Sequence, residues 1–283
     1  MFTPLSSLCI DTREFLVKRD DLIDPYLAGN KYRKLYTLLH TPKEKYQTLI
    51  SYGGTQSNAM LAIAALCQKK NWQFIYYTKP LSSWQKENLG GNYAQAVALG
   101  MKHKEVASEY YKEFIATLAL SLDSKSCLLH QGGADRNVQE GVASLAQEIR
   151  DVAPDVEALA TPSGTGTTAL YLAKSLPEYT LYTTALVGDT EYLKEQMRAL
   201  EKIPENLIFL EPQKRYHFAK PYKEFYEVYK KLFDLGIEFD LIYAPLMWKM
   251  LLEQTKGKVL YIHSGGTSGN ATMLQRYRKK ALC

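Results

Sequence analysis

Residues 163–168 (SGTGTT) combine glycines with four hydroxyl side chains, the residue types that bind a phosphate-like anion. Glycines let the backbone approach a ligand closely, and free N–H groups at a helix start attract negative charge. The segment has no lysine, so it is not a nucleotide P-loop. Four hydroxyls suit a terminal monophosphate, but two other interpretations stay open. One is a plain turn with an N-cap threonine, and the other is a dinucleotide fingerprint through Gly164, Gly166 and Ala169.

Lys31 is the candidate nucleophile, because it follows a Gly29-Asn30 turn and opens the helix-like stretch KYRKLYTLL. A helix N-terminus disfavours an ammonium ion and so lowers the pKa of a lysine placed there. A less protonated lysine is suited to Schiff-base chemistry. The alternative is that the charged run at residues 17–39 is simply the solvated start of a helix.

Two more turns carry polar residues directly after an expected strand. In residues 53–58 (GGTQSN), Ser57 and Asn58 are strong N-cap types, and the same free N–H groups suit a substrate carboxylate. Residues 263–269 (HSGGTSG) come after a strand near the end of the chain. A flexible loop is the alternative there, and His263 is more typical of a structural than a catalytic histidine.

The elements that must position these turns alternate between β-rich and helix-like segments. We expect strands at 47–52, 72–78, 126–130, 157–160, 179–187, 207–210 and 258–263, and helices at 59–70, 92–99, 138–150, 169–175, 191–200 and 222–235. Such alternation predicts β-α-β units and parallel sheets. Parallel sheets bind ligands in the turns after the strands. Functional residues should therefore cluster in the turns at 53–58, 132–137, 163–168 and 264–269.

Composition narrows the class of protein. A chain of 283 residues suggests about two domains. Its 46% hydrophobic and 23% charged residues exclude a disordered, fibrous or coiled-coil protein. The net charge of +5 gives no reason to expect nucleic acid. The longest apolar stretch, residues 59–67, is too short for a bilayer, and we expect neither a secretion signal nor a metal site. Four scattered cysteines indicate reduced thiols and a cytoplasmic location.

Together the segments resemble the family of D-cysteine desulfhydrase and 1-aminocyclopropane-1-carboxylate deaminase. The matching segments are KRDDLIDPYLAGNKYRKL, ISYGGTQSNAMLAIAALC, GGADRNVQEGVASLAQEI, PSGTGTTA and VLYIHSGGTSG. The resemblance implies dependence on pyridoxal 5'-phosphate and the tryptophan-synthase-β-like α/β fold, fold type II. That fold has two open, twisted, mainly parallel domains with the cofactor in the cleft between them. Residues 1–40 plus 134–283 would form the larger, cofactor-binding domain and residues 41–133 the smaller, in a homodimer.

The resemblance also implies a role for each candidate residue. Lys31 would be catalytic and hold the cofactor covalently, and Ser57 would be catalytic beside the substrate carboxylate. The cofactor-binding set adds a 3′-oxygen partner, a phosphate cup and a hydroxyl near the pyridine nitrogen: Asn58, then Gly164, Thr165, Gly166 and Thr167, then Ser264. The substrate-binding set is Ser57, Asn58 and Ala59.

Some positions depart from the family pattern. Phe218 and Met247 stand where the family has active-site tyrosines, with Tyr216, His217 and Tyr243 nearby in the sequence. Residues 244–249 lack the acidic residue that deaminase members carry. Losing both phenols argues against opening of a cyclopropane ring.

The expected function is therefore α,β-elimination on a small amino acid, giving a 2-oxo acid and ammonia, in the manner of D-cysteine desulfhydrase. Three alternatives remain open. They are a racemase on the same fold, a non-catalytic protein that binds pyridoxal phosphate or an amino acid, and a dinucleotide enzyme built on residues 164–169. The expected partner is a small amino-acid substrate, with no nucleic acid and no membrane.

Overall fold

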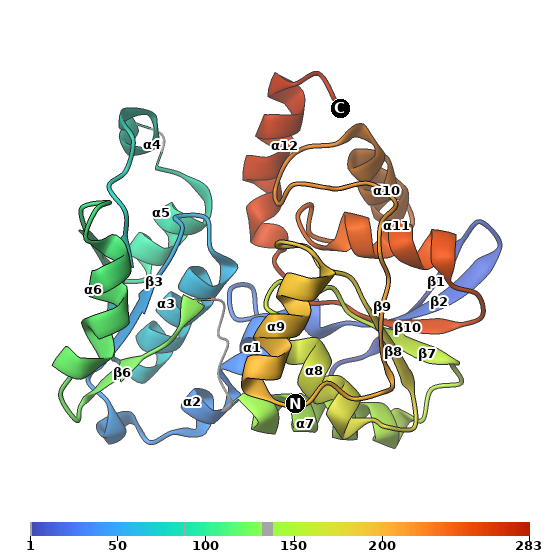
Figure 1. The fold of residues 1–283 in the computed structure, drawn as a ribbon, viewed down its shortest axis with the longest axis horizontal. Helices are drawn as coiled ribbons and strands as arrows, with labels where there is room; N and C mark the ends of the chain where they lie inside the picture. Colours follow the sequence, from blue (N-terminus) through green and yellow to red (C-terminus); the bar gives the residue numbers. More distant parts are fainter. Residues whose placement is uncertain (1, 88, 132–137) are drawn as a thin grey trace.

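The computed structural model describes residues 2–87, 89–131 and 138–283, whose strands form two mainly parallel sheets (Figure 1). The larger sheet has the order β1-β2-β10-β7-β8-β9. Its strands are β1 (Leu5–Ile10), β2 (Arg13–Lys18), β7 (Ala158–Ala160), β8 (Thr180–Thr183), β9 (Leu207–Phe209) and β10 (Val259–Ile262). Only the β1–β2 hairpin is antiparallel among these pairs.

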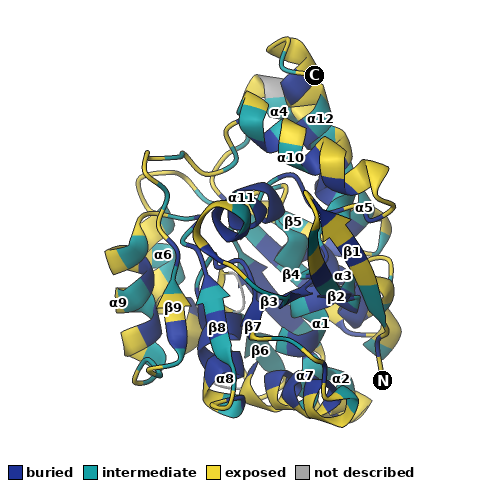
Figure 2. Cartoon of the chain, turned by 90° about the vertical axis from the view of Figure 1, so that its right-hand side faces the viewer, coloured by how far each residue is buried: buried dark blue, intermediate teal, exposed yellow. Residues whose placement is uncertain are grey.

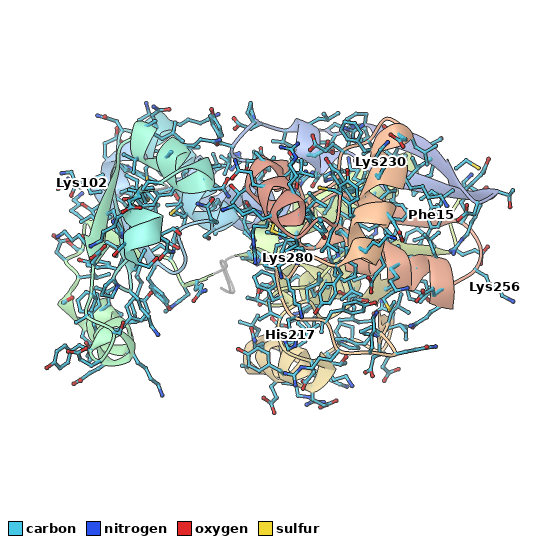
Figure 3. The ribbon with its side chains drawn as sticks, turned by 90° about the horizontal axis from the view of Figure 1, so that it is seen from above. Phe15, Lys102, His217, Lys230, Lys256 and Lys280 are labelled. Atoms are coloured by element: carbon cyan, nitrogen blue, oxygen red, sulfur yellow. The ribbon has the colours of Figure 1, made fainter. Side chains whose placement is uncertain are left out.

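The smaller sheet is parallel throughout its described strands, in the order β5-β4-β3-β6. These are β3 (Thr48–Tyr52), β4 (Gln73–Thr78), β5 (Met101–Glu105) and β6 (Ser126–Leu128). Helix α3 (Asn58–Lys70) supplies an unbroken buried run to this core, and α4 (Ser83–Glu87), α5 (Gly91–Ala98) and α6 (Tyr111–Thr117) lie on the same lobe (Figure 1). Seen from above, this lobe carries Lys102, and the other carries Phe15, Lys230 and Lys256 (Figure 3).

The larger sheet is buried on both faces, as parallel sheets usually are. Along β10, Val259 and Tyr261 enter one core while Leu260 and Ile262 enter the other. The remaining helices are α7 (Gln139–Val152), α8 (Thr167–Ser175), α9 (Thr190–Leu200), α10 (Lys223–Asp234), α11 (Ala244–Gln254) and α12 (Asn270–Lys279). Helices α8 and α11 are largely buried, whereas α9 and α10 turn an exposed side to solvent (Figure 2).

Two short helices, α1 (Gly29–Lys34) and α2 (Tyr36–His40), lie between the lobes (Figure 1). Leu35, between them, packs into the core of the smaller sheet. Arg33 instead faces the larger sheet, where its guanidinium donates to both carboxylate oxygens of Asp20 at 2.9 and 3.0 Å and to Glu148 at 2.6 Å. Glu148 also accepts from Lys18 at 2.7 Å. We call Lys18, Asp20, Arg33 and Glu148 the buried ionic cluster.

The two mainly parallel sheets confirm the expected α/β fold class. The expected strands and helices are present within a few residues. The β1–β2 hairpin, β5 and the helices α4, α6, α11 and α12 were not predicted. The expected helix KYRKLYTLL is broken at Leu35. The turn at 132–137 and the domain junction at 133–134 lie outside the described residues. Within the described part of the chain, no helix is both long and apolar enough to span a membrane.

Candidate functional site

A pocket joins three parts of the chain that the sequence had marked as functional. Lys31 lines it from α1, Asn58 from the start of α3, and residues 265–268 from the turn after β10. Residues that precede α1, including Asp21 and Tyr26, complete the wall. Segments that follow strands of both sheets therefore meet at this pocket. Parallel sheets bind ligands at this end of their strands.

Lys31 is held in place by a close contact between its helix and the turn after β10. Gly29 has a φ of 56°, and a Cβ there would lie 2.0 Å from the carbonyl oxygen of Ser264. The Asn30 N–H donates to that oxygen at 3.2 Å. Burial lowers the pKa of Lys31 to about 8, although the nearby Asp240 charge opposes the shift. The direction agrees with the sequence prediction, but the cause is desolvation rather than a helix N-terminus.

At the start of α3, two polar side chains have different partners. Ser57 caps the helix by accepting from the Met60 N–H at 3.3 Å, as its residue type predicts. The Asn58 Oδ1 atom accepts from Asn92 at 2.7 Å, while its Nδ2 atom faces Gly266 across the pocket wall. Ala59 is half-buried in the same first turn. The substrate-binding roles of these residues stay predictions.

Residues 163–168, which we call the glycine-hydroxyl loop, adopt a geometry that suits the binding of an anion. Gly166 has a φ of 75° at the N-cap of α8, and a Cβ there would lie 2.4 Å from the Met197 methyl carbon. The hydroxyls of Thr165 and Thr167 lie 3.1 Å apart. Thr168 Oγ1 is buried and has no hydrogen-bond partner within the described chain. The hydroxyls of these threonines therefore lie at the N-terminus of α8, where an anion is stabilised.

Ser163 has a structural role, because its hydroxyl is buried against the Thr183 hydroxyl at 2.7 Å. This bond ties the loop to β8. Its backbone also pairs with Ala185, which extends the strand pairing into the loop.

Lys34 is a site residue that the sequence reasoning missed. Its Nζ atom lies 3.4 Å from Thr165 Oγ1, so α1 brings a second amine to the glycine-hydroxyl loop. Burial lowers the pKa of Lys34 well below its ordinary value, and the neighbouring Lys31 charge adds to the shift. The available signal was its position three residues after Lys31, which puts both amines on one side of a helix.

The turn after β10 is fixed by His263, which is 1% exposed. Its Nδ1 atom accepts from the Gly265 N–H at 3.1 Å, so Nε2 carries the proton and donates to the Glu238 carbonyl at 2.9 Å. The ring stacks on Phe239 with centroids 4.4 Å apart. These contacts give His263 the structural role that its residue type suggested, and they place Ser264 beside α1.

Tyr243, and not Met247, brings its side chain to the glycine-hydroxyl loop. Met247 is fully buried in the core of the larger sheet. A Cβ at Gly164 would lie 3.3 Å from the Tyr243 ring, and Phe218 packs on that ring with centroids 5.6 Å apart. That Met247 stands at the position of a family tyrosine stays a prediction, since the segment has only a loose match to the family. Tyr216 packs against other aromatics, and His217 is exposed.

Comparisons with known proteins agree with this geometry. Residues 3–189 match a family model described as "Pyridoxal-phosphate dependent enzyme". A protein of Thermotoga maritima named "Putative 1-aminocyclopropane-1-carboxylate deaminase" is 26% identical over 89% of this chain and 88% of its own length. A protein of Pyrococcus furiosus with the same name is 25% identical over 90% of this chain and 85% of its own.

The fold is also similar to that of a solved structure described as an ACC deaminase homologue. The TM-score is 0.74 at 21% identity, over 98% of this chain and 94% of the other. The family model covers well over half of the sequence and includes Lys31, Asn58 and the glycine-hydroxyl loop. The chain therefore belongs to the family of pyridoxal-phosphate dependent enzymes, and its cofactor is pyridoxal 5'-phosphate.

Proposed function

We propose that this enzyme is a lyase that removes the α-proton and a β-substituent from a small amino acid, with release of ammonia and a 2-oxo acid. The observation that carries the proposal is the pocket in which Lys31, Asn58 and the turn after Ser264 meet, with Lys34 reaching the glycine-hydroxyl loop. The names of the Thermotoga maritima and Pyrococcus furiosus relatives support a deaminase reaction.

The residues present fit pyridoxal phosphate. The phosphate would lie in the cradle of Gly164, Thr165, Gly166 and Thr167, where the α8 N-terminus and the Lys34 amine offset its negative charge. Asn58 would hydrogen-bond the 3′-oxygen, and Ser264 would face the ring nitrogen. When bound, the cofactor supplies an electron sink that stabilises negative charge at the α-carbon of an amino acid.

The protein's own groups would handle the proton and the substrate. With a pKa of about 8, Lys31 has a substantial neutral fraction near neutral pH, so its amine can accept the α-proton. The free N–H groups at the start of α3, beside Ser57 and Asn58, would orient the substrate carboxylate. Tyr76 holds this turn through a hydrogen bond from its hydroxyl to the Gly54 carbonyl at 3.1 Å.

Two features favour elimination over ring opening. Phe218 packs on the Tyr243 ring beside the glycine-hydroxyl loop but lacks a hydroxyl, so its position offers no phenol for ring opening. The start of α11 is apolar and buried, with no carboxylate in residues 244–249. A hydroxyl from Ser264 would leave the ring nitrogen neutral, which gives a milder electron sink suited to a substrate with a good β-leaving group.

The test is a screen of the purified enzyme with small D- and L-amino acids, including D-cysteine, for ammonia, sulfide and 2-oxo acid. Release of all three from D-cysteine, lost in Lys31→Ala, is the expected result. An inverted α-carbon without ammonia would identify a racemase instead. Bound cofactor without exchange of any α-proton in deuterated water would identify a binding protein.

A further inference from the structure

Asp240 is a buried carboxylate that accepts hydrogen bonds from backbone N–H groups of its own turn. It is 3% exposed and lies in the turn that leads into α11. Its Oδ1 atom accepts from the backbone N–H groups of Ile242 and Tyr243 at 3.0 and 2.5 Å. An amide side chain could accept the same two bonds, so the turn alone does not require a charge at this position.

The carboxylate lies beside the pocket that Lys31 lines. A Cβ at Gly266 would lie 2.6 Å from Asn58 Nδ2 and 3.8 Å from the Asp240 Cβ, which places Gly266 between these two residues. Gly266 and Lys31 line the same pocket. Lys31 and Asp240 form no direct ion pair, but the charge of each shifts the pKa of the other. Removing an unpaired charge from water is costly, so two opposite charges that are buried on either side of one pocket wall stabilise each other.

We propose that Asp240 is the buried counter-ion of the Lys31 amine and controls how readily that amine gives up its proton. Asp240 is then a positioning residue that acts through Lys31, and it touches no reacting atom. The proposal rests on the proposed function only in taking Lys31 as the proton-accepting amine. It adds a residue that neither the family resemblance nor the sequence pattern singled out.

The ionisable groups around this pair come from three elements. Lys34, on α1, repels Lys31, while the phenols of Tyr243 and Tyr261 face Asp240 from the α11 turn and from β10. Burial raises the pKa of Asp240 to about 6. Backbone hydrogen bonds from Tyr243, Ile242 and Ala244 limit that shift, and the Lys31 charge adds a smaller effect in the same direction. Above pH 6 the carboxylate is therefore charged and favours the protonated form of Lys31. Removing this charge should lower the pKa of Lys31 further.

The test measures Lys31 in the cofactor-free enzyme, so it does not depend on turnover. The protein is treated briefly with acetic anhydride at a series of pH values, and acetylation of Lys31 is quantified by peptide mass spectrometry. In the wild type, labelling should reach half its maximum near pH 8. In Asp240→Asn the midpoint should fall by about one pKa unit, which gives about fivefold faster labelling at pH 7.

Glu238→Gln is the matched control, because it makes the same change of carboxylate to amide two residues away. The Glu238 side chain binds Asn270 and Tyr229 instead of facing Lys31. It should leave the Lys31 midpoint unchanged, and Asp240→Glu should restore a midpoint close to that of the wild type. An unchanged midpoint in Asp240→Asn would overturn the proposal.

If Asp240→Asn does not fold, a second measurement tests the pairing of Asp240 with Lys31. In the wild-type protein, the carboxyl carbon of Asp240 can be followed by ¹³C NMR during a pH titration. It should titrate near pH 6, and a second change in its signal should accompany the titration of Lys31 near pH 8. A carboxyl signal that is insensitive to the ionisation of Lys31 would refute the pairing. Inactivity towards amino acids would affect neither readout.

Discussion

At the residue scale, we expect the Lys34 amine to strengthen the binding of pyridoxal phosphate. A hydrogen bond to a charged group contributes about 1.5–3 kcal/mol, so Lys34→Gln should weaken binding of pyridoxal phosphate by roughly 10- to 100-fold. The measurement is an equilibrium titration of the cofactor-free enzyme, followed by absorbance. Lys174→Gln is the control. Lys174 lies near the end of α8, where it is exposed and paired with Glu201. Equal affinities of the two variants would contradict the assignment of Lys34 to the phosphate.

The candidate residues could be found from their types because each stands in a turn between elements. Lys31, Asn58 and Gly164 are separated widely in the sequence and follow strands of two different sheets. In each sheet, parallel topology places ligand-binding turns at the carboxyl ends of the strands. Asp240 was missed because nothing local marks it, and Lys34 was missed because its spacing from Lys31 does not by itself indicate a ligand. Their roles arise from burial beside Lys31, and a side chain's burial depends on the packing of distant segments.

At the scale of elements, the position of Lys31 depends on how closely α1 and α7 pack. A Cβ at Gly141 on α7 would lie 1.9 Å from the Arg33 carbonyl oxygen on α1. Gly141→Ala should therefore force the helices apart and destabilise the protein by about 1–3 kcal/mol, as overpacking does. Denaturant unfolding measures this change, and cofactor affinity should fall with it.

Gly90→Ala provides the comparison for that substitution, because no atom lies within 4 Å of a Cβ built there. Its free energy of unfolding should stay close to that of the wild type. If Gly141→Ala unfolded at the same denaturant concentration as Gly90→Ala, close packing of α1 against α7 would not position Lys31.

Helices and strands were predictable where the pattern of apolar residues and the turn residues around it indicate the same element. The buried run of α3 and the strand β4 follow directly from apolar patterning and turn residues. The hairpin β1–β2 was missed because its turn residues, Asp11 and Thr12, adopt positive φ values of 49° and 68° without a glycine to signal them. The break at Leu35 was also hidden, since the local sequence remains helix-like throughout.

At the scale of the whole molecule, the buried ionic cluster joins the N-terminal hairpin, α1 and α7. Burial alone would raise the pKa of Glu148, but hydrogen bonds from Arg33 and Lys18 outweigh this effect and lower it below its ordinary value of 4.5. A carboxylate with a lowered pKa in the folded state stabilises the fold above its unfolded pKa. That stability is lost as the pH falls through the folded value.

The prediction is that the free energy of unfolding falls below about pH 4.5, and that Glu148→Gln removes part of this dependence. The variant should also be less stable at pH 7 by about 3–5 kcal/mol, because Lys18 and Arg33 lose a buried partner. Urea unfolding at pH 4 and pH 7 tests both statements. Parallel pH profiles for the variant and the wild type would show that Glu148 does not contribute.

The division into two lobes was predictable from the family resemblance, whereas the contacts between them were not. The pocket depends on side chains from α1, α3 and the turn after β10, and their approach is set by close backbone contacts such as Gly29 with Ser264. A sequence pattern indicates that a glycine is present, but the partner that requires it becomes visible only in three dimensions.

The most direct test of the account is to find which amine carries the cofactor. Enzyme reconstituted with pyridoxal phosphate is reduced with borohydride, digested and mapped by mass spectrometry. The account predicts a phosphopyridoxyl group on Lys31, with Lys34 unlabelled although it lies three residues away. A label on Lys34 or on any other lysine, or no label after reconstitution, would contradict it.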